Sequence, residues 1–160
     1  MDWGPMGSRR RFDMNYDWKA GELALTYNRI EPDGPKVQRA IDLVKFIRPL
    51  YDPDIEVRER FFIVGVSRSN KIRSCFELGA GGCAGRVVDP KLVFARLLLD
   101  NCAAFICSHN HPSGNPSPSA ADKRLTKQLK DGGKPLDIAM LDHIIITSDK
   151  YQSFAELNLI

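Results

Sequence analysis

The chain has 160 residues, of which 43% are hydrophobic and 27% are charged, and its formal net charge at pH 7 is +3. This length suffices for a single domain with a hydrophobic core, and the composition is ordinary for a globular protein. So small an excess of positive charge is insufficient evidence for nucleic-acid binding. No run approaches the roughly 20 apolar residues of a membrane-spanning helix, and no signal peptide is recognisable, so we expect a cytoplasmic protein.

The four cysteines show no Cys-x-x-Cys pair. A zinc finger or zinc ribbon is therefore poorly supported, and a disulfide framework is usually denser than this in a shorter secreted chain. We expect four reduced thiols, at Cys75, Cys83, Cys102 and Cys107.

The predicted domain follows an N-terminal tail. Residues 1–20 are interpreted as flexible, and the arginines at 9–11 as a solvated cluster of charge rather than a phosphate-binding arm. Residues 21–160 are predicted to form one domain. Its leading section, residues 21–54, contains no recognisable catalytic motif.

Strands and a helix are predicted in the first half of this domain. A strand is expected at residues 22–27, and apolar residues at helical spacing predict an amphipathic helix over 40–50. Residues 59–66 and 72–78 have the composition of strands, and the polar turn at 67–71 joins them into a hairpin.

A glycine-rich stretch at residues 79–85 follows the hairpin. It lacks the Gly-Lys-Ser/Thr ending of a P-loop, so we expect a flexible loop near the cleft. A helix is then predicted from Asp89, as N-cap, and Pro90, at the first helical position. Its leucines, including those at 97–99, are predicted to belong to the core.

Two histidines follow an apolar strand predicted at residues 103–107. Residues two apart at a strand end point to the same side, so His109 and His111 can present their rings to one ion. A loop then ends at Ser119, and the helix predicted over 120–130 returns Asp122 towards the strand end. Two histidines and one aspartate leave a coordination position for water, which is typical of catalytic zinc.

Asp122 also has a purely structural interpretation. Ser119-x-x-Asp122 matches a helix capping box, in which the hydroxyl and the carboxylate bind amide groups of the first turn. Taken alone, the pattern favours capping. Seven residues after a His-x-His pair, it favours metal binding by Asp122.

The spacing His-x-His, seven residues and Ser-x-x-Asp resembles the JAMM (MPN+) metallohydrolase motif, and His-Asn-His-Pro-Ser-Gly resembles its RadC-like branch. The resemblance covers residues 56–160. It implies a mixed α/β fold of the JAMM or cytidine-deaminase-like type, a mostly antiparallel sheet flanked by two main helices, with its cleft beside His109. A true zinc deaminase is disfavoured, because His-x-Glu and Pro-Cys-x-x-Cys are absent.

The resemblance also implies two catalytic roles. In JAMM-like proteins a glutamate near the start of such a strand holds the zinc-bound water, and Glu59 occupies the matching place. A carboxylate there can take the proton of the water and return it to the leaving group, although Glu56 and Glu77 compete for the role. The resemblance assigns Ser119 to a hydrogen bond with the developing oxyanion.

His143 follows Asp142 at the start of a strand region predicted over 136–147. A fourth metal ligand is one interpretation, but a role supporting the ligands or the cleft is favoured. A short closing helix is expected at residues 153–157.

Two functional hypotheses follow. The first is a zinc-dependent hydrolase of amide bonds, acting on a peptide or isopeptide in a peptide or protein substrate. The alternative is a DNA-repair-associated accessory or DNA-binding protein, as the RadC label implies, whose metal site is not a peptidase. The low net charge, and the absence of the helix-hairpin-helix module often found ahead of RadC-type metal domains, count against DNA binding.

Overall fold

The computed structural model describes residues 34–80 and 88–160. The predicted tail, the strand at 22–27, Cys83 and most of the glycine-rich stretch lie outside these residues. In the described part of the chain, no helix combines the length and the hydrophobicity that crossing a membrane requires.

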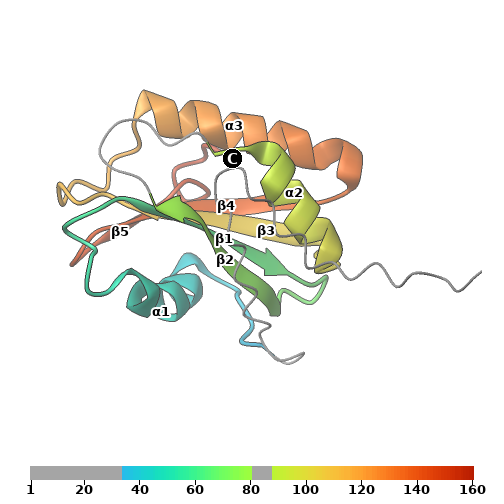
Figure 1. Ribbon diagram of the computed structural model, residues 1–160, viewed down its shortest axis with the longest axis horizontal. Helices are drawn as coiled ribbons and strands as arrows, with labels where there is room; N and C mark the ends of the chain where they lie inside the picture. The colour runs from blue at the N-terminus through green and yellow to red at the C-terminus, as the bar shows by residue number, and fades with distance from the viewer. Residues whose placement is uncertain (1–33, 81–87) are drawn as a thin grey trace, which may run out of the picture.

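A five-stranded sheet in the order β2-β1-β3-β4-β5 forms the centre of the fold (Figure 1). Its strands are β1 (Arg60–Val66), β2 (Ile72–Ala80), β3 (Ala104–Asn110), β4 (Ala139–Ile146) and β5 (Tyr151–Ser153). β3 and β4 are parallel, and the other neighbours are antiparallel. The predicted mixed α/β fold with a mostly antiparallel sheet is thus confirmed.

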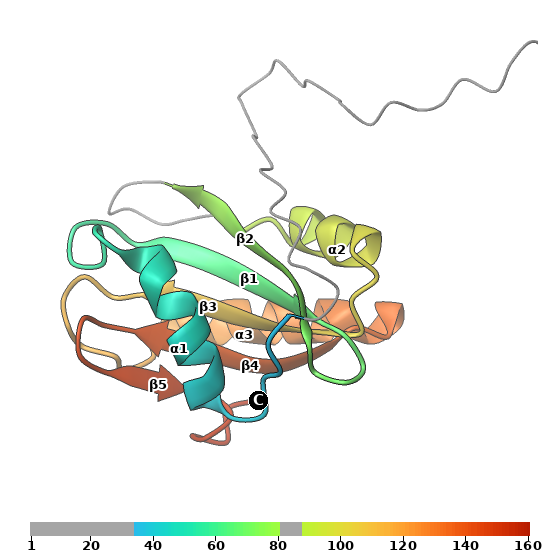
Figure 2. The same cartoon turned by 90° about the horizontal axis from the view of Figure 1, so that it is seen from below.

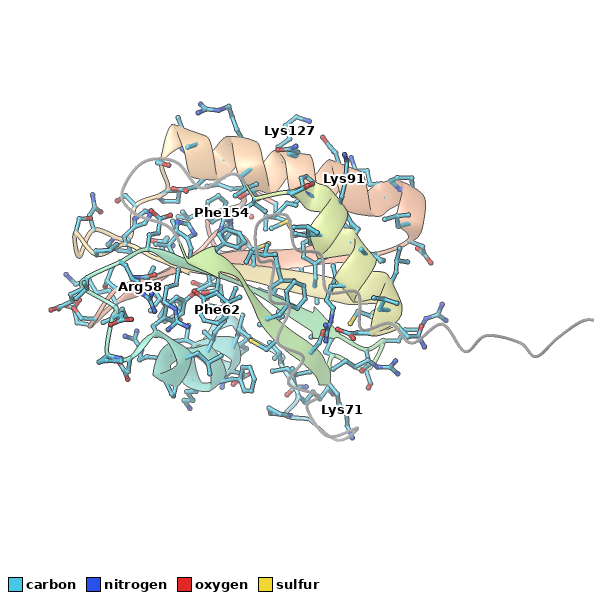
Figure 3. The ribbon with its side chains drawn as sticks, viewed as in Figure 1. Arg58, Phe62, Lys71, Lys91, Lys127 and Phe154 are labelled. Atoms are coloured by element: carbon cyan, nitrogen blue, oxygen red, sulfur yellow. The ribbon has the colours of Figure 1, made fainter. Side chains whose placement is uncertain are left out.

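Helices cover both faces of the sheet. α1 (Ala40–Tyr51) lies on one face, and α2 (Pro90–Leu99) and α3 (Ala120–Gly133) lie on the other (Figures 1 and 2). The described chain therefore has three flanking helices rather than the two expected. Each face has its own buried apolar cluster. Phe62 lies on the α1 side of the sheet, and Phe154 lies between the sheet and α3 (Figure 3).

Local sequence signals set the helix starts. Asp89 caps α2 by accepting a hydrogen bond from the backbone N–H of Lys91, and Pro90 occupies the first turn. α3 ends at Gly133 and continues as a short 3-10 helix, Lys134–Leu136. A Cβ atom on Gly133 would lie 2.2 Å from the backbone oxygen of Ile138, so this close approach requires glycine.

Three details of the predicted elements are wrong. Leu98 and Leu99 are 54% and 65% exposed, because α2 buries Val93, Phe94 and Leu97 on the opposite side. The expected closing helix at 153–157 is absent, because Ser153 pairs with Ile144 as part of β5 and only turns follow. The glycine-rich stretch begins within a strand, because β2 extends to Ala80.

Candidate metal centre

Strand β3 and helix α3 bring His109, His111 and Asp122 together, as the motif predicted. His109 is the last residue but one of β3, and His111 directly follows the end of the strand. Asp122 occupies the third position of α3. One ligand atom from each residue lies within 4.8 Å of the others. The two segments meet because the 111–119 loop returns the chain from the strand end to the helix start.

The donor atoms of the three side chains face one another. The Nε2 atoms of His109 and His111 are 2.9 Å apart. Oδ1 of Asp122 is 3.3 Å from Nε2 of His109, and Oδ2 is 3.6 Å from Nε2 of His111. Tetrahedral zinc with bonds of ~2.0–2.2 Å separates its ligand atoms by about 3.3–3.6 Å, so small adjustments would fit the set to such an ion.

A hydrogen bond at Nδ1 fixes the tautomer of the His111 ring. Nδ1 lies 2.7 Å from the backbone oxygen of Asn115, which can only accept a hydrogen bond. Nδ1 therefore carries the hydrogen in the neutral ring, and the lone pair of Nε2 points towards His109 and Asp122. A lone pair and a carboxylate at this distance favour a cation between them, either a proton or a metal ion.

The metal-free electrostatics agree with this arrangement. The hydrogen bond with Asp122 raises the pKa of His111 above 6.5. Burial alone would raise the pKa of Asp122, but hydrogen bonds with His109, His111 and Ser119 lower it to well below 3.8. The carboxylate is thus ionised at neutral pH and attracts a positive charge.

Capping and metal binding by Asp122 are geometrically compatible. The backbone N–H of Ser119 donates to Oδ2 of Asp122 at 2.7 Å, and the backbone N–H of Asp122 donates to Oγ of Ser119 at 3.1 Å. This reciprocal capping box leaves Oδ1 directed at His109. The two interpretations of the sequence pattern therefore describe one structure, in which the cap orients the carboxylate.

A cleft of about 510 Å³ opens beside the three side chains. Among the described residues, its lining includes Glu59, Ser119, Arg124, Leu125 and Gln128. Both predicted catalytic residues thus border the cleft that contains the three candidate metal ligands. Their catalytic roles stay predictions.

Strand register explains why Glu59 is near the histidines. Phe61 pairs with His109 in the antiparallel β1–β3 ladder, so continuing the register by two residues puts Glu59 opposite His111. The negative charge of Glu59 contributes to the raised pKa of His111. The competitors differ: Glu77 is engaged by Arg60 through contacts of 3.0 and 2.7 Å, and Glu56 is exposed and outside the lining of the cleft.

His143 lies behind His109, on the side away from Asp122. Its Nε2 is 2.8 Å from Nδ1 of His109, so it contacts the ring nitrogen that does not face the other ligands. It is outside the group of three donor residues, which agrees with a supporting role. Burial lowers the pKa of His143 well below 6.5, and this ring is neutral.

Sequence reasoning missed two buried polar residues at the site, Thr126 and Asn110. Thr126 contacts Nδ1 of His143 at 2.7 Å and lies one helical turn after Asp122, a spacing that places both on one helix face. Asn110 lies between the two histidines and binds the backbone ahead of β1. The i, i+4 spacing could have identified Thr126, whereas the partners of Asn110 are about 50 residues away and left no local signal.

Residues 37–159 match the family model of the RadC-like JAB domain. A UPF0758 protein of Salinibacter ruber is 43% identical over 149 residues, which are 89% of this chain and 64% of the relative. A UPF0758 protein of Flavobacterium johnsoniae is 46% identical over 98 residues, 61% of this chain and 43% of the relative. The chain spans less than two thirds of the length of these relatives, and their name states neither a reaction nor a role in DNA repair.

Proposed function

Since this chain belongs to the RadC-like JAB domain family, we propose that it is a zinc-dependent hydrolase of amide bonds in peptides or isopeptides. One observation carries the proposal: two histidine Nε2 atoms and an ionised carboxylate converge in a cleft that Glu59 also borders. A purely structural zinc site would normally complete its coordination with a fourth protein ligand and would have no use for a neighbouring carboxylate.

Bound zinc would supply an acidified water and a Lewis acid for the substrate carbonyl. Glu59 is an exposed carboxylate at the cleft, and in this proposal it accepts the proton of the attacking water. It then returns the proton to the amine that leaves, so one residue acts as base and acid in turn.

Ser119 is proposed to stabilise the negative charge that develops on the carbonyl oxygen. Its hydroxyl oxygen already accepts a hydrogen bond from the backbone N–H of Asp122, which holds it at the cleft. A serine hydroxyl has one hydrogen to donate in addition to its acceptor capacity. The capping box uses the hydroxyl only as an acceptor, so in this proposal the hydrogen that Ser119 directs at the Asp122 carboxylate turns to the oxyanion as its charge develops.

The cleft wall is compatible with a peptide. α3 contributes the apolar side chain of Leu125 and the polar side chains of Arg124 and Gln128. Apolar contacts with a few directed polar groups are usual for sites that bind short stretches of polymer or small ligands.

The experiment that tests the proposal measures metal content and peptide cleavage on the same preparations. We expect about one zinc per native chain and its loss in His111→Ala. Glu59→Gln should keep its zinc but lose cleavage of fluorogenic peptides or isopeptides by at least about 100-fold. Glu56→Gln is the matched control, because this glutamate is exposed and outside the cleft. A native protein that stays metal-free after zinc is supplied would refute the proposal.

A further inference from the structure

A buried chain of hydrogen bonds connects two of the three donor residues from behind. Nδ1 of His109 is 2.8 Å from Nε2 of His143, and Nδ1 of His143 is 2.7 Å from Oγ1 of Thr126. Oγ1 of Thr126 then donates to the backbone oxygen of Asp122 at 2.7 Å. The side chains of His109, His143 and Thr126 are at most 2% exposed, so water does not compete for these contacts.

The donor and the acceptor of each hydrogen bond in this series follow from the group at its end, the backbone oxygen of Asp122. A backbone carbonyl only accepts, so Thr126 uses its one hydroxyl hydrogen on Asp122. Thr126 must then accept from Nδ1–H of His143. In the neutral ring this leaves Nε2 of His143 without hydrogen, and it accepts from Nδ1–H of His109. When the His109 ring is neutral, as metal binding requires, the lone pair of its Nε2 therefore faces the cleft.

We propose that His143 and Thr126 are positioning residues that hold His109 in the tautomer whose Nε2 binds the metal. The inference rests on the metal site of the proposed function but not on the reaction. His111 reaches the same state through the Asn115 carbonyl, so the two rings use different partners for the same purpose. Partners of this kind typically fix the orientation of a ligand and raise its basicity.

Packing restricts the same two rings. Phe61 is stacked on His109 with a centroid separation of 5.8 Å, and Phe154 is stacked on His143 at 4.7 Å. The aromatic contacts limit ring tilt, whereas the hydrogen bonds select the tautomer. Because the series of hydrogen bonds ends at the backbone oxygen of Asp122, the positions of His109 and Asp122 are coupled through α3.

Zinc affinity, measured by competition with a chelator, tests the inference without any activity assay. His143→Leu removes the acceptor and should weaken zinc binding about 10- to 100-fold. His143→Gln places an amide oxygen near the position of Nε2 and should recover most of that loss. Thr126→Val leaves Nδ1–H of His143 without an acceptor and should weaken binding about 10-fold, whereas Thr126→Ser should not.

Ser108→Ala is the matched control. Ser108 is buried on the same strand, next to His109, but bonds to the hydroxyl of Tyr51 at 2.9 Å on the α1 side. Loss of the Ser108 hydroxyl should lower the midpoint temperature of unfolding without changing zinc affinity. A zinc affinity of His143→Leu equal to that of the native protein, with the fold retained, would overturn the inference.

Nitrogen-15 NMR of the native protein provides a second test, which needs no variant to fold. We expect the His109 ring to carry hydrogen on Nδ1, and the opposite tautomer would overturn the inference. Absence of zinc from the native protein would instead refute the proposed function, and the NMR result would still decide the tautomer. The two failures are therefore distinguishable.

Discussion

Asn110 accepts a hydrogen bond from the backbone N–H of Arg60 at 2.7 Å, so the residue between the two histidines also holds the start of β1. Its amide group donates to the backbone oxygens of Ile55 and Arg58 at 2.7 and 2.9 Å. These contacts bracket Glu59 on both sides. The His-Asn-His segment thus positions the proposed base as well as two of the proposed metal ligands.

Asn110→Ala should reduce catalysis more than metal binding. The substitution leaves buried backbone groups without partners, and we expect a loss of stability of about 2–4 kcal/mol. At temperatures where the variant is folded, kcat/KM should fall at least about 10-fold because Glu59 is no longer held, while zinc affinity changes little. Chelator competition and peptide cleavage on one preparation measure both effects. Equal losses of affinity and activity would contradict this role.

Substitutions at Ser119 can separate capping from catalysis. Ser119→Asp retains a good N-cap but has no hydroxyl hydrogen, so we expect near-native thermal stability and a fall in kcat of about 100-fold. Ser119→Thr retains both functions and is the control. Ser119→Ala should lose about 1 kcal/mol of stability together with the activity. Native activity in Ser119→Asp would show that the residue serves only as a cap.

The convergence of the three proposed metal ligands could be predicted because its signal is local. His109 and His111 are two residues apart at a strand end, and Asp122 begins the next helix, so short-range geometry nearly determines their meeting. The hydrogen-bond partners could not be predicted in this way. His143 reaches His109 through parallel pairing of β3 with β4, in which Cys107 is opposite His143, and neither motif nor periodicity specifies that register.

Apolar periodicity predicted the helices and strands well, but it was less informative about which of their side chains are buried. It predicted α1, α2 and the main strands, because each has a side that faces one of the two buried clusters. It failed for Leu98 and Leu99, since consecutive leucines surround the helix and the sequence does not show which of them meets the sheet.

Glu77→Gln should affect stability rather than catalysis. Glu77 pairs with Arg60 through two contacts, and Arg60 also donates to the backbone oxygen of Leu50 at the end of α1. Because the pair is only partly exposed, we expect a loss of about 1–2 kcal/mol, measured by urea denaturation. Activity per folded molecule should match the native protein. A catalytic loss as large as that of Glu59→Gln would instead identify Glu77 as the base.

Zinc affinity should fall as the pH is lowered, because zinc competes with a proton on His111. The pKa of this ring is raised above 6.5 by Asp122, so below that pKa each zinc ion that binds must displace at least one proton. Affinity should therefore decrease by about 10-fold or more per pH unit in that range and level off above it. The Asp122 carboxylate, whose pKa is lowered, stays ionised from pH 5 to pH 8 and contributes no slope there. Calorimetric titration in buffers of different ionisation enthalpy counts the protons released, and zinc binding that releases none at pH 6 would contradict the prediction.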